Sequence, residues 1–374
     1  MSKKAFRTAL LVVLGTLAIA LCVAGWYGWQ LYQYPDQRHA GTGVEVKVTI
    51  DKGMSFPQVA SRLAQHRIID RPSWFRFYAM RRGATTAVKT GEYTLRDNMT
   101  PHEVLDALIA GVQARSVAVT LPEGKNMLEL FALIEEAGVA KASELEALAR
   151  DAEFLRKHGI AGDSVDGLLF PDTYKFVVPT APRKVLERLI EAHRATWNGL
   201  AREHGKALGK LKDRLQWSDR DVLILASIVE KEAVDPAERP RIAQVFVNRM
   251  VSPTFKPKRL ETDPTIRYGC LVSPTPSAAC IAWNEPCRKA VPPRPDGCER
   301  LRRAQLDDRD NPYNTYQHEG LPPGPIGNPG RASMEAAMKP DGSDYFFFVA
   351  KDPRTHVFSK TVAEHEAAVD KYMR

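Results

Sequence analysis

The sequence ASIVEKEA at residues 226–233 closes an almost wholly apolar run whose spacing predicts a buried helix. Residues three, four and seven apart share one face of a helix, so Glu230 lies over Ser227 and Leu223. Glu232 is turned from Glu230 by about 200° around the helix axis. The helix therefore carries one acid on its apolar side and directs the other elsewhere.

A carboxyl group in apolar surroundings favours its protonated form, because burial disfavours the charge. A carboxyl that keeps its proton is what a general acid in the cleavage of sugars requires. Glu230 is therefore the candidate catalytic residue, and Glu232 is expected to matter little for catalysis.

The chain has 374 residues, which is enough for two or three domains, and a net charge of +8. Its basic residues are scattered and form no recognisable nucleic-acid motif, so we expect no nucleic-acid partner. An anionic cell-wall polymer or a lipid surface explains the charge as well.

An uncharged, mostly apolar run at residues 8–29 follows Lys3, Lys4 and Arg7 and has the length of a membrane-spanning helix. The preceding positive charges place the N-terminus in the cytoplasm. Aromatic residues suited to the far interface lie at and just beyond the end of the run: Trp26, Tyr27, Trp29 and Tyr32. The alternative is a signal peptide cleaved after Ala18-Ile19-Ala20, but the apolar run continues well past that point and favours an uncleaved anchor.

Four cysteines beyond the anchor lie close together in the sequence: Cys270, Cys280, Cys287 and Cys298. In an oxidising compartment they predict two disulfides, with all three pairings open. A structural zinc site typically needs ligands spaced as Cys-x₂₋₄-Cys, and the spacing here is wider. We therefore expect disulfides and no metal.

A strand–turn–helix pattern occurs twice, because residues 46–53 are similar to residues 117–124 and a helical pattern follows each. Thr49 and Thr120 are separated by as many residues as Gly53 and Gly124. Small βα units of this kind beside a membrane anchor resemble the LysM fold, which binds N-acetylated glycans. A packing or spacer module is the alternative.

Polar side chains in three further segments are candidates to converge with Glu230. The run GLPPGPIGNPG at residues 320–330 is too rich in Pro and Gly for a helix or a central strand and must be a fixed loop. Amide and hydroxyl groups beside such a loop suit a saccharide groove, although stiff turns also use them to satisfy their own backbone. The predicted substrate-binding residues are Asn248, Asp263, Tyr268, Asn314, Thr315 and Tyr316.

Seven motifs together resemble the endolytic murein transglycosylases of the YceG-like family. They are ASIVEKEA at 226–233, LETDPTIRYG at 260–269, NPYNTY at 311–316, GLPPGPIGNPG at 320–330, DGLLFPDTYKF at 166–176, YFFFVA at 345–350 and HVFSKT at 356–361. The family's catalytic glutamate closes ASIVE, which is Glu230 in this sequence.

The resemblance implies an α+β protein of the inner membrane whose catalytic domain is periplasmic. The implied parts are a cytoplasmic tail (1–7), a transmembrane helix (8–29), a linker (30–43), a LysM-like subdomain (44–115) and a mixed α+β catalytic domain (116–374). The implied reaction cleaves the MurNAc–GlcNAc bond within nascent peptidoglycan strands and leaves 1,6-anhydro ends, with no cofactor. It also implies that the protein ends strand elongation beside penicillin-binding peptidoglycan synthases.

The sequence departs from the family pattern in two places. Asp166-Gly167 stands where the family usually has Glu-Gly, a conservative change expected to leave catalysis alone. The cysteine-containing segment at residues 270–300 is longer than the family pattern and is treated as an insertion.

Two other functions stay open from the sequence. One is a non-catalytic glycan-binding scaffold of the synthesis machinery. The other is a glycoside hydrolase, which uses two carboxylates; Glu232, Glu261 and Asp263 are then the candidates for the second acid.

Overall fold

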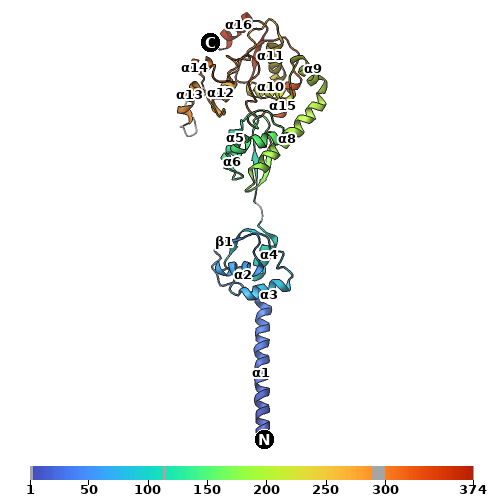
Figure 1. The fold of residues 1–374 in the computed structure, drawn as a ribbon, viewed down its shortest axis with the longest axis vertical. Helices are drawn as coiled ribbons and strands as arrows, with labels where there is room; N and C mark the ends of the chain where they lie inside the picture. Colours follow the sequence, from blue (N-terminus) through green and yellow to red (C-terminus); the bar gives the residue numbers. More distant parts are fainter. Residues whose placement is uncertain (1–2, 113–114, 289–299, 374) are drawn as a thin grey trace. The chain divides into compact units, whose positions relative to one another are not determined.

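The computed structural model describes residues 3–112, 115–288 and 300–373. The chain divides into two compact units, Met1–Ala114 and Arg115–Arg374 (Figure 1). Each unit has its own hydrophobic core. Among the described residues the strands form three separate antiparallel pairs surrounded by helices, which confirms the predicted α+β class.

The first unit begins with helix α1, Lys3–Gln33. This helix is long and apolar enough to cross a membrane by length and composition. The aromatic residues near its end have exposed side chains: Trp26, Tyr27, Trp29 and Tyr32. The predicted apolar run at residues 8–29 lies wholly within α1.

The rest of the first unit has the order strand, helix, helix, strand, helix. Its elements are β1 (Glu45–Ile50), α2 (Phe56–Gln65), α3 (Pro72–Arg81), β2 (Gly91–Arg96) and α4 (Pro101–Ala110). β1 and β2 pair antiparallel, with Val48 opposite Tyr93. Both of these side chains are buried, because alternate residues of each strand face the helices.

The second unit opens with a similar order. Its first elements are β3 (Ser116–Thr120), α5 (Met127–Glu136), α6 (Ala142–Ala149), α7 (Ala152–Lys157), β4 (Thr173–Val177), α8 (Pro182–Glu203) and α9 (Gly205–Leu215). The two strand–turn–helix units expected from the sequence are both present. Gly53 and Gly124 have positive φ angles of 89° and 74°, a conformation that glycine adopts without steric cost.

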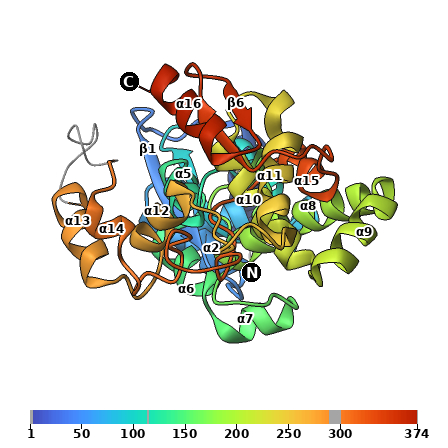
Figure 2. The ribbon, with the colours of Figure 1, turned by 90° about the horizontal axis from the view of Figure 1, so that it is seen from above.

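The remaining elements of the second unit follow in chain order. They are α10 (Asp219–Glu232), η2 (Pro236–Glu238), α11 (Arg239–Val251), α12 (Asp263–Leu271), α13 (Ala278–Arg288), α14 (Arg303–Leu306), α15 (Arg331–Met338), β5 (Phe347–Ala350), β6 (His356–Ser359) and α16 (Val362–Tyr372). Ser218 caps α10 by accepting the N–H of Asp221, and every residue from Val222 to Val229 is buried. α10 packs against α15 and α11 (Figures 1 and 2).

One face of α10 holds the Pro- and Gly-rich loop at residues 320–330. Arg220 donates from Nη2 to the carbonyl of Pro323 at 3.0 Å. Ser227 accepts the N–H of Ile326 on Oγ at 3.0 Å, and Glu230 accepts the N–H of Gly330 on Oε2 at 2.9 Å. Because the three side chains share one helix face, the loop runs along the helix and ends at the acid.

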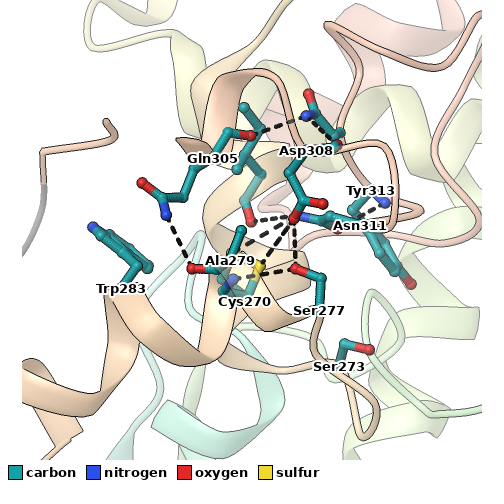
Figure 3. The surroundings of a disulfide bond; sticks show 12 residues. Cys270, Ser273, Ser277, Ala279, Trp283, Gln305, Asp308, Asn311 and Tyr313 are labelled. Carbon is teal, nitrogen blue, oxygen red and sulfur yellow. Dashed lines mark hydrogen bonds between the residues drawn. A yellow bond between two sulfur atoms is a disulfide. The ribbon is translucent and has the colours of Figure 1, made fainter. Parts of the chain in front are cut away.

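The cysteine-containing segment is joined to the second unit by a disulfide between Cys270 of α12 and Cys280 of α13 (Figure 3). Asn311 lies beside this bond and donates from Nδ2 to the carbonyl of Ile266 at 3.1 Å. The other two predicted disulfide partners, the side chain of Cys287 and all of Cys298, lie outside the described residues.

Candidate active site

Glu230 occupies the last turn of α10, and only 7% of its side chain is exposed. Its Oε1 accepts a hydrogen bond from Nη2 of Arg239 at 3.3 Å, and its Oε2 accepts the N–H of Gly330 at 2.9 Å. Arg239 begins α11, and Gly330 is the N-cap residue of α15. The carboxyl group is therefore fixed from both sides at the point where three helices meet.

A second carboxyl group lies beside Glu230 and was not expected from the sequence. Glu123, in the turn after β3, places Oε2 4.0 Å from Nη2 of Arg239, and 51% of its side chain is exposed. A Cβ added to Gly330 would overlap the carboxylate of Glu123, so Glu123 touches the same residue whose N–H holds Glu230. Burial, and then the negative charge of Glu230, raises the pKa of Glu123, while the charge of Arg239 opposes that rise.

The turn carrying Glu123 lies against α10 at Gly124. A Cβ on Gly124 would lie 3.4 Å from Cγ of Glu230, and the positive φ of this residue favours glycine. Gly124 also donates its N–H to the carbonyl of Asn328 at 2.8 Å. The repeated glycine in the sequence was the one available signal of this turn, and it indicated a tight bend without indicating its neighbour.

Asp166 joins three parts of the second unit beneath this site. Its carboxylate accepts the N–H of Met127 at 3.0 Å, Nδ2 of Asn328 at 2.8 Å and the hydroxyl of Tyr268 at 2.9 Å. Burial raises its pKa to about 6, against the effect of these donors. Asp166 therefore fixes the loop two residues before Gly330, so the position where the sequence departs from the family pattern supports the site directly.

Glu232 lies in a different setting. It accepts a hydrogen bond from Oγ of Thr262, and burial, followed by the charge of Asp263, raises its pKa. Asp263 in turn accepts the hydroxyl of Tyr316 at 3.0 Å. Among the described residues, Glu230 forms its hydrogen bonds and ion pair with Arg239 and Gly330, and not with Asp263.

Three of the other predicted groove residues, Asn248, Asn314 and Thr315, bond to the protein's own backbone. Asn248 donates to the carbonyls of Ser343 and Tyr345 at 2.9 and 2.8 Å. Asn314 is fully buried and donates to the carbonyls of Gln305, Leu306 and Asp308. The Thr315 hydroxyl lies 2.9 Å from that of Thr265 and accepts the N–H of Thr262. Tyr268 bonds to Asp166, and substrate binding by all six predicted residues stays a prediction.

Potential cation ligands occur elsewhere in the second unit. One oxygen each from Glu203 and Glu335 and one nitrogen of His204 lie within 4.8 Å of one another. Nε2 of His204 is 3.2 Å from Oε1 of Glu335, and Arg331 also pairs with Glu203. These contacts make the group an ion-pair cluster between α8 and α15.

Residues 48–371 match the YceG-like family. Since this match covers most of the sequence, the chain belongs to that family. The matched residues include the whole of the site around Glu230 and the second strand–turn–helix unit, and the match begins within β1 of the first unit.

Relatives with established names have similar sequences. A protein of Bacillus subtilis (strain 168) named endolytic murein transglycosylase is 29% identical over 343 residues, which cover 88% of this chain and 85% of that relative. A protein of Streptococcus pneumoniae (strain D39) with the same name is 24% identical over 97% of this chain, and the chain spans 65% of its length. The crystal structure of a YceG-like protein from Listeria monocytogenes has a TM-score of 0.52 and 27% identity, covering 87% of this chain and 99% of that one.

Proposed function

We propose that this protein is a peptidoglycan lytic transglycosylase, a carbon–oxygen lyase that cuts the MurNAc–GlcNAc bond within nascent glycan strands and leaves 1,6-anhydro-MurNAc ends. Its family membership and the names of its relatives support the enzyme class. The observation that carries the proposal is the nearly buried carboxyl of Glu230, fixed at the end of an apolar helix and adjacent to a half-exposed second carboxyl.

In the proposed reaction Glu230 serves first as acid and then as base. The protonated carboxyl donates its proton to the glycosidic oxygen as the bond from that oxygen to C1 breaks. The N-acetyl oxygen of the substrate stabilises the positive charge at C1. The C6 hydroxyl then bonds to C1 and returns its proton to Glu230. The N–H of Gly330 holds Oε2 at 2.9 Å, whereas Arg239 holds Oε1 by the longer contact of 3.3 Å, so we assign the proton exchange to Oε1.

The identity of the products tests this proposal. Full-length protein in detergent is incubated with purified glycan strands, and the new ends are identified by mass. We expect anhydro ends from the natural sequence and none from Glu230→Gln. Reducing ends would mean a two-carboxylate hydrolase, and intact strands with retained binding would mean a glycan-binding scaffold.

We also infer that α1 anchors the enzyme in the inner membrane, with the N-terminus in the cytoplasm and the second unit in the periplasm. The length of α1 and the basic residues Lys3, Lys4 and Arg7 support this orientation. Such an anchor keeps the site near the membrane where nascent strands emerge, beside penicillin-binding synthases. The β1–α2–α3–β2 order supports a LysM-like, glycan-binding role for residues 44–115.

A further inference from the structure

We propose that Glu123 is a second catalytic carboxylate, which contacts the bound sugar and stabilises the positive charge that develops at C1 as the glycosidic bond breaks. This inference rests on the function proposed above. It assigns a substrate-facing role to a residue that lies in the turn between β3 and α5, apart in the sequence from every motif around Glu230.

The geometry places Glu123 in the same site as Glu230. Both carboxylates approach the same nitrogen, Nη2 of Arg239, at 4.0 Å and 3.3 Å. Both also adjoin Gly330. Glu230 accepts the N–H of Gly330, and the carboxylate of Glu123 occupies the space that a Cβ on Gly330 would need. Two elements distant in sequence therefore meet with their acids side by side.

Arg239 makes this pairing possible. Two neighbouring carboxylates repel each other, and a cation between them offsets that repulsion. Only 10% of the Arg239 side chain is exposed, so its charge is weakly screened by water and acts on both acids. Its Nη2 bonds to Glu230 and lies 4.0 Å from Glu123, while its Nε has no hydrogen-bond partner among the described residues.

The two carboxyl groups differ in their access to a ligand. Glu230 is almost covered, and both of its oxygens already have partners. Half of the Glu123 side chain is open to solvent, which leaves it free to approach a sugar ring. Paired carboxyl groups in unlike surroundings divide acid catalysis and charge stabilisation between them in glycosidases.

The step assigned to Glu123 involves no covalent bond. The proton that leaves Glu230 goes to the departing oxygen and returns from the C6 hydroxyl, while Glu123 remains an anion throughout. Its negative charge acts on the transition state, where C1 carries more positive charge than in the bound substrate. Removing that charge should therefore lower kcat and leave KM nearly unchanged.

Steady-state kinetics of full-length protein in detergent, with purified glycan strands, test the assignment. We expect Glu123→Gln to lower kcat about 100-fold, similar to the loss of one charge-stabilising group in other enzymes, with KM changed less than about threefold. Glu123→Asp should recover part of the lost rate. Gly330→Ala should also lower kcat, because it keeps the backbone N–H but displaces the carboxylate of Glu123.

Glu146→Gln is the matched control. Glu146 lies on α6, is also about half exposed, and pairs with Arg150 at the C-terminal end of that helix. It should retain the natural kcat. A Glu123→Gln protein with unchanged kcat overturns the assignment while leaving the proposed function intact. A higher KM and a lower thermal stability with unaltered kcat also overturn the assignment, because they indicate a structural role for Glu123. If the natural sequence itself forms no anhydro ends, the proposed function fails and the assignment fails with it.

Discussion

Glu230 and Glu232 stand two residues apart on α10, yet they belong to different parts of the second unit. Glu230 joins Arg239, Gly330 and, through that arginine, Glu123. Glu232 joins Thr262 and lies near the charge of Asp263. Both carboxyl groups are held within the protein, so burial alone does not distinguish them.

Glu230 and Glu232 differ in the chemical type and the solvent exposure of the groups around them. Around Glu230 the partners are a cation, a backbone N–H and a carboxylate with half its surface in solvent. Around Glu232 the hydrogen-bond donor is the hydroxyl of Thr262, and the charges of Asp263 and Arg249 also act on its carboxyl group. Asp263 is itself bonded to the hydroxyl of Tyr316. A reactive acid needs an accessible side, and beside Glu230 the half-exposed Glu123 is a second group that can approach a ligand.

The largest expected contrast is between Glu230→Gln and Glu232→Gln. Glu230→Gln should lower turnover on glycan strands by at least about 10³-fold, because the acid and base of the proposed reaction are lost together. Glu232→Gln should retain turnover within about fivefold, because an amide oxygen still accepts the hydroxyl of Thr262. Equal losses, measured at matched thermal stability, would show that the two regions form one site.

The next largest effect is expected from Asp166→Asn, which should change how the free energy of unfolding depends on pH. Burial raises the pKa of Asp166 from 3.8 to about 6, so the folded protein binds this proton more tightly than the unfolded chain does. Its contribution to the free energy of unfolding is therefore full below about pH 4 and is lost as the pH rises through about 6. The difference corresponds to about 3 kcal/mol.

The asparagine variant lacks this titration, so it should gain about 3 kcal/mol relative to the natural protein between about pH 4 and pH 7. Its Oδ1 still accepts from Met127 and Asn328. Urea unfolding at several pH values measures the effect, and Asp213→Asn, at an exposed position, serves as control. Parallel pH curves for Asp166→Asn and the natural protein would refute the expectation.

The smallest expected effect comes from the loop contacts. Ser227→Ala leaves the buried N–H of Ile326 without its acceptor and should cost about 1–3 kcal/mol of stability. It should also lower turnover, because the same loop ends at Gly330. Thr262→Val removes the hydroxyl that bonds to Glu232 and should lower stability while leaving turnover within a few-fold. Thermal midpoints and initial rates of both variants, compared with Ser227→Thr, check this contrast.

Several features of the fold were predictable because they depend on neighbouring residues in the sequence. The apolar run at residues 8–29 gave a helix, and the apolar spacing before Glu230 gave the buried face of α10. Pro and Gly in residues 320–330 excluded regular structure there, and those residues form the loop along α10. Each of these predictions follows from backbone geometry over a few residues.

The partners of the site residues were less predictable. Asn314 and Thr315 have side chains suited to a sugar groove, and sequence alone did not indicate that they also bond to the backbone. The change to Asp166 was expected to leave catalysis alone, which stays a prediction, but the sequence did not indicate that its carboxylate bonds to three separate segments. A polar residue type shows what a side chain can bond to, while its partner depends on segments that arrive from elsewhere in the chain.

The sequence by itself determined that Glu230 and Glu232 face different directions, because the helical period sets the angle between them. Only the tertiary structure decided which of the surrounding acids joins Glu230. The sequence offered Glu232, Glu261 and Asp263 as candidates for a second acid. The folded chain also brings Glu123 beside Glu230, because the turn at Gly124 is held against the loop before Gly330. That meeting depends on the packing of β3, α10 and α15, and no local periodicity encodes it.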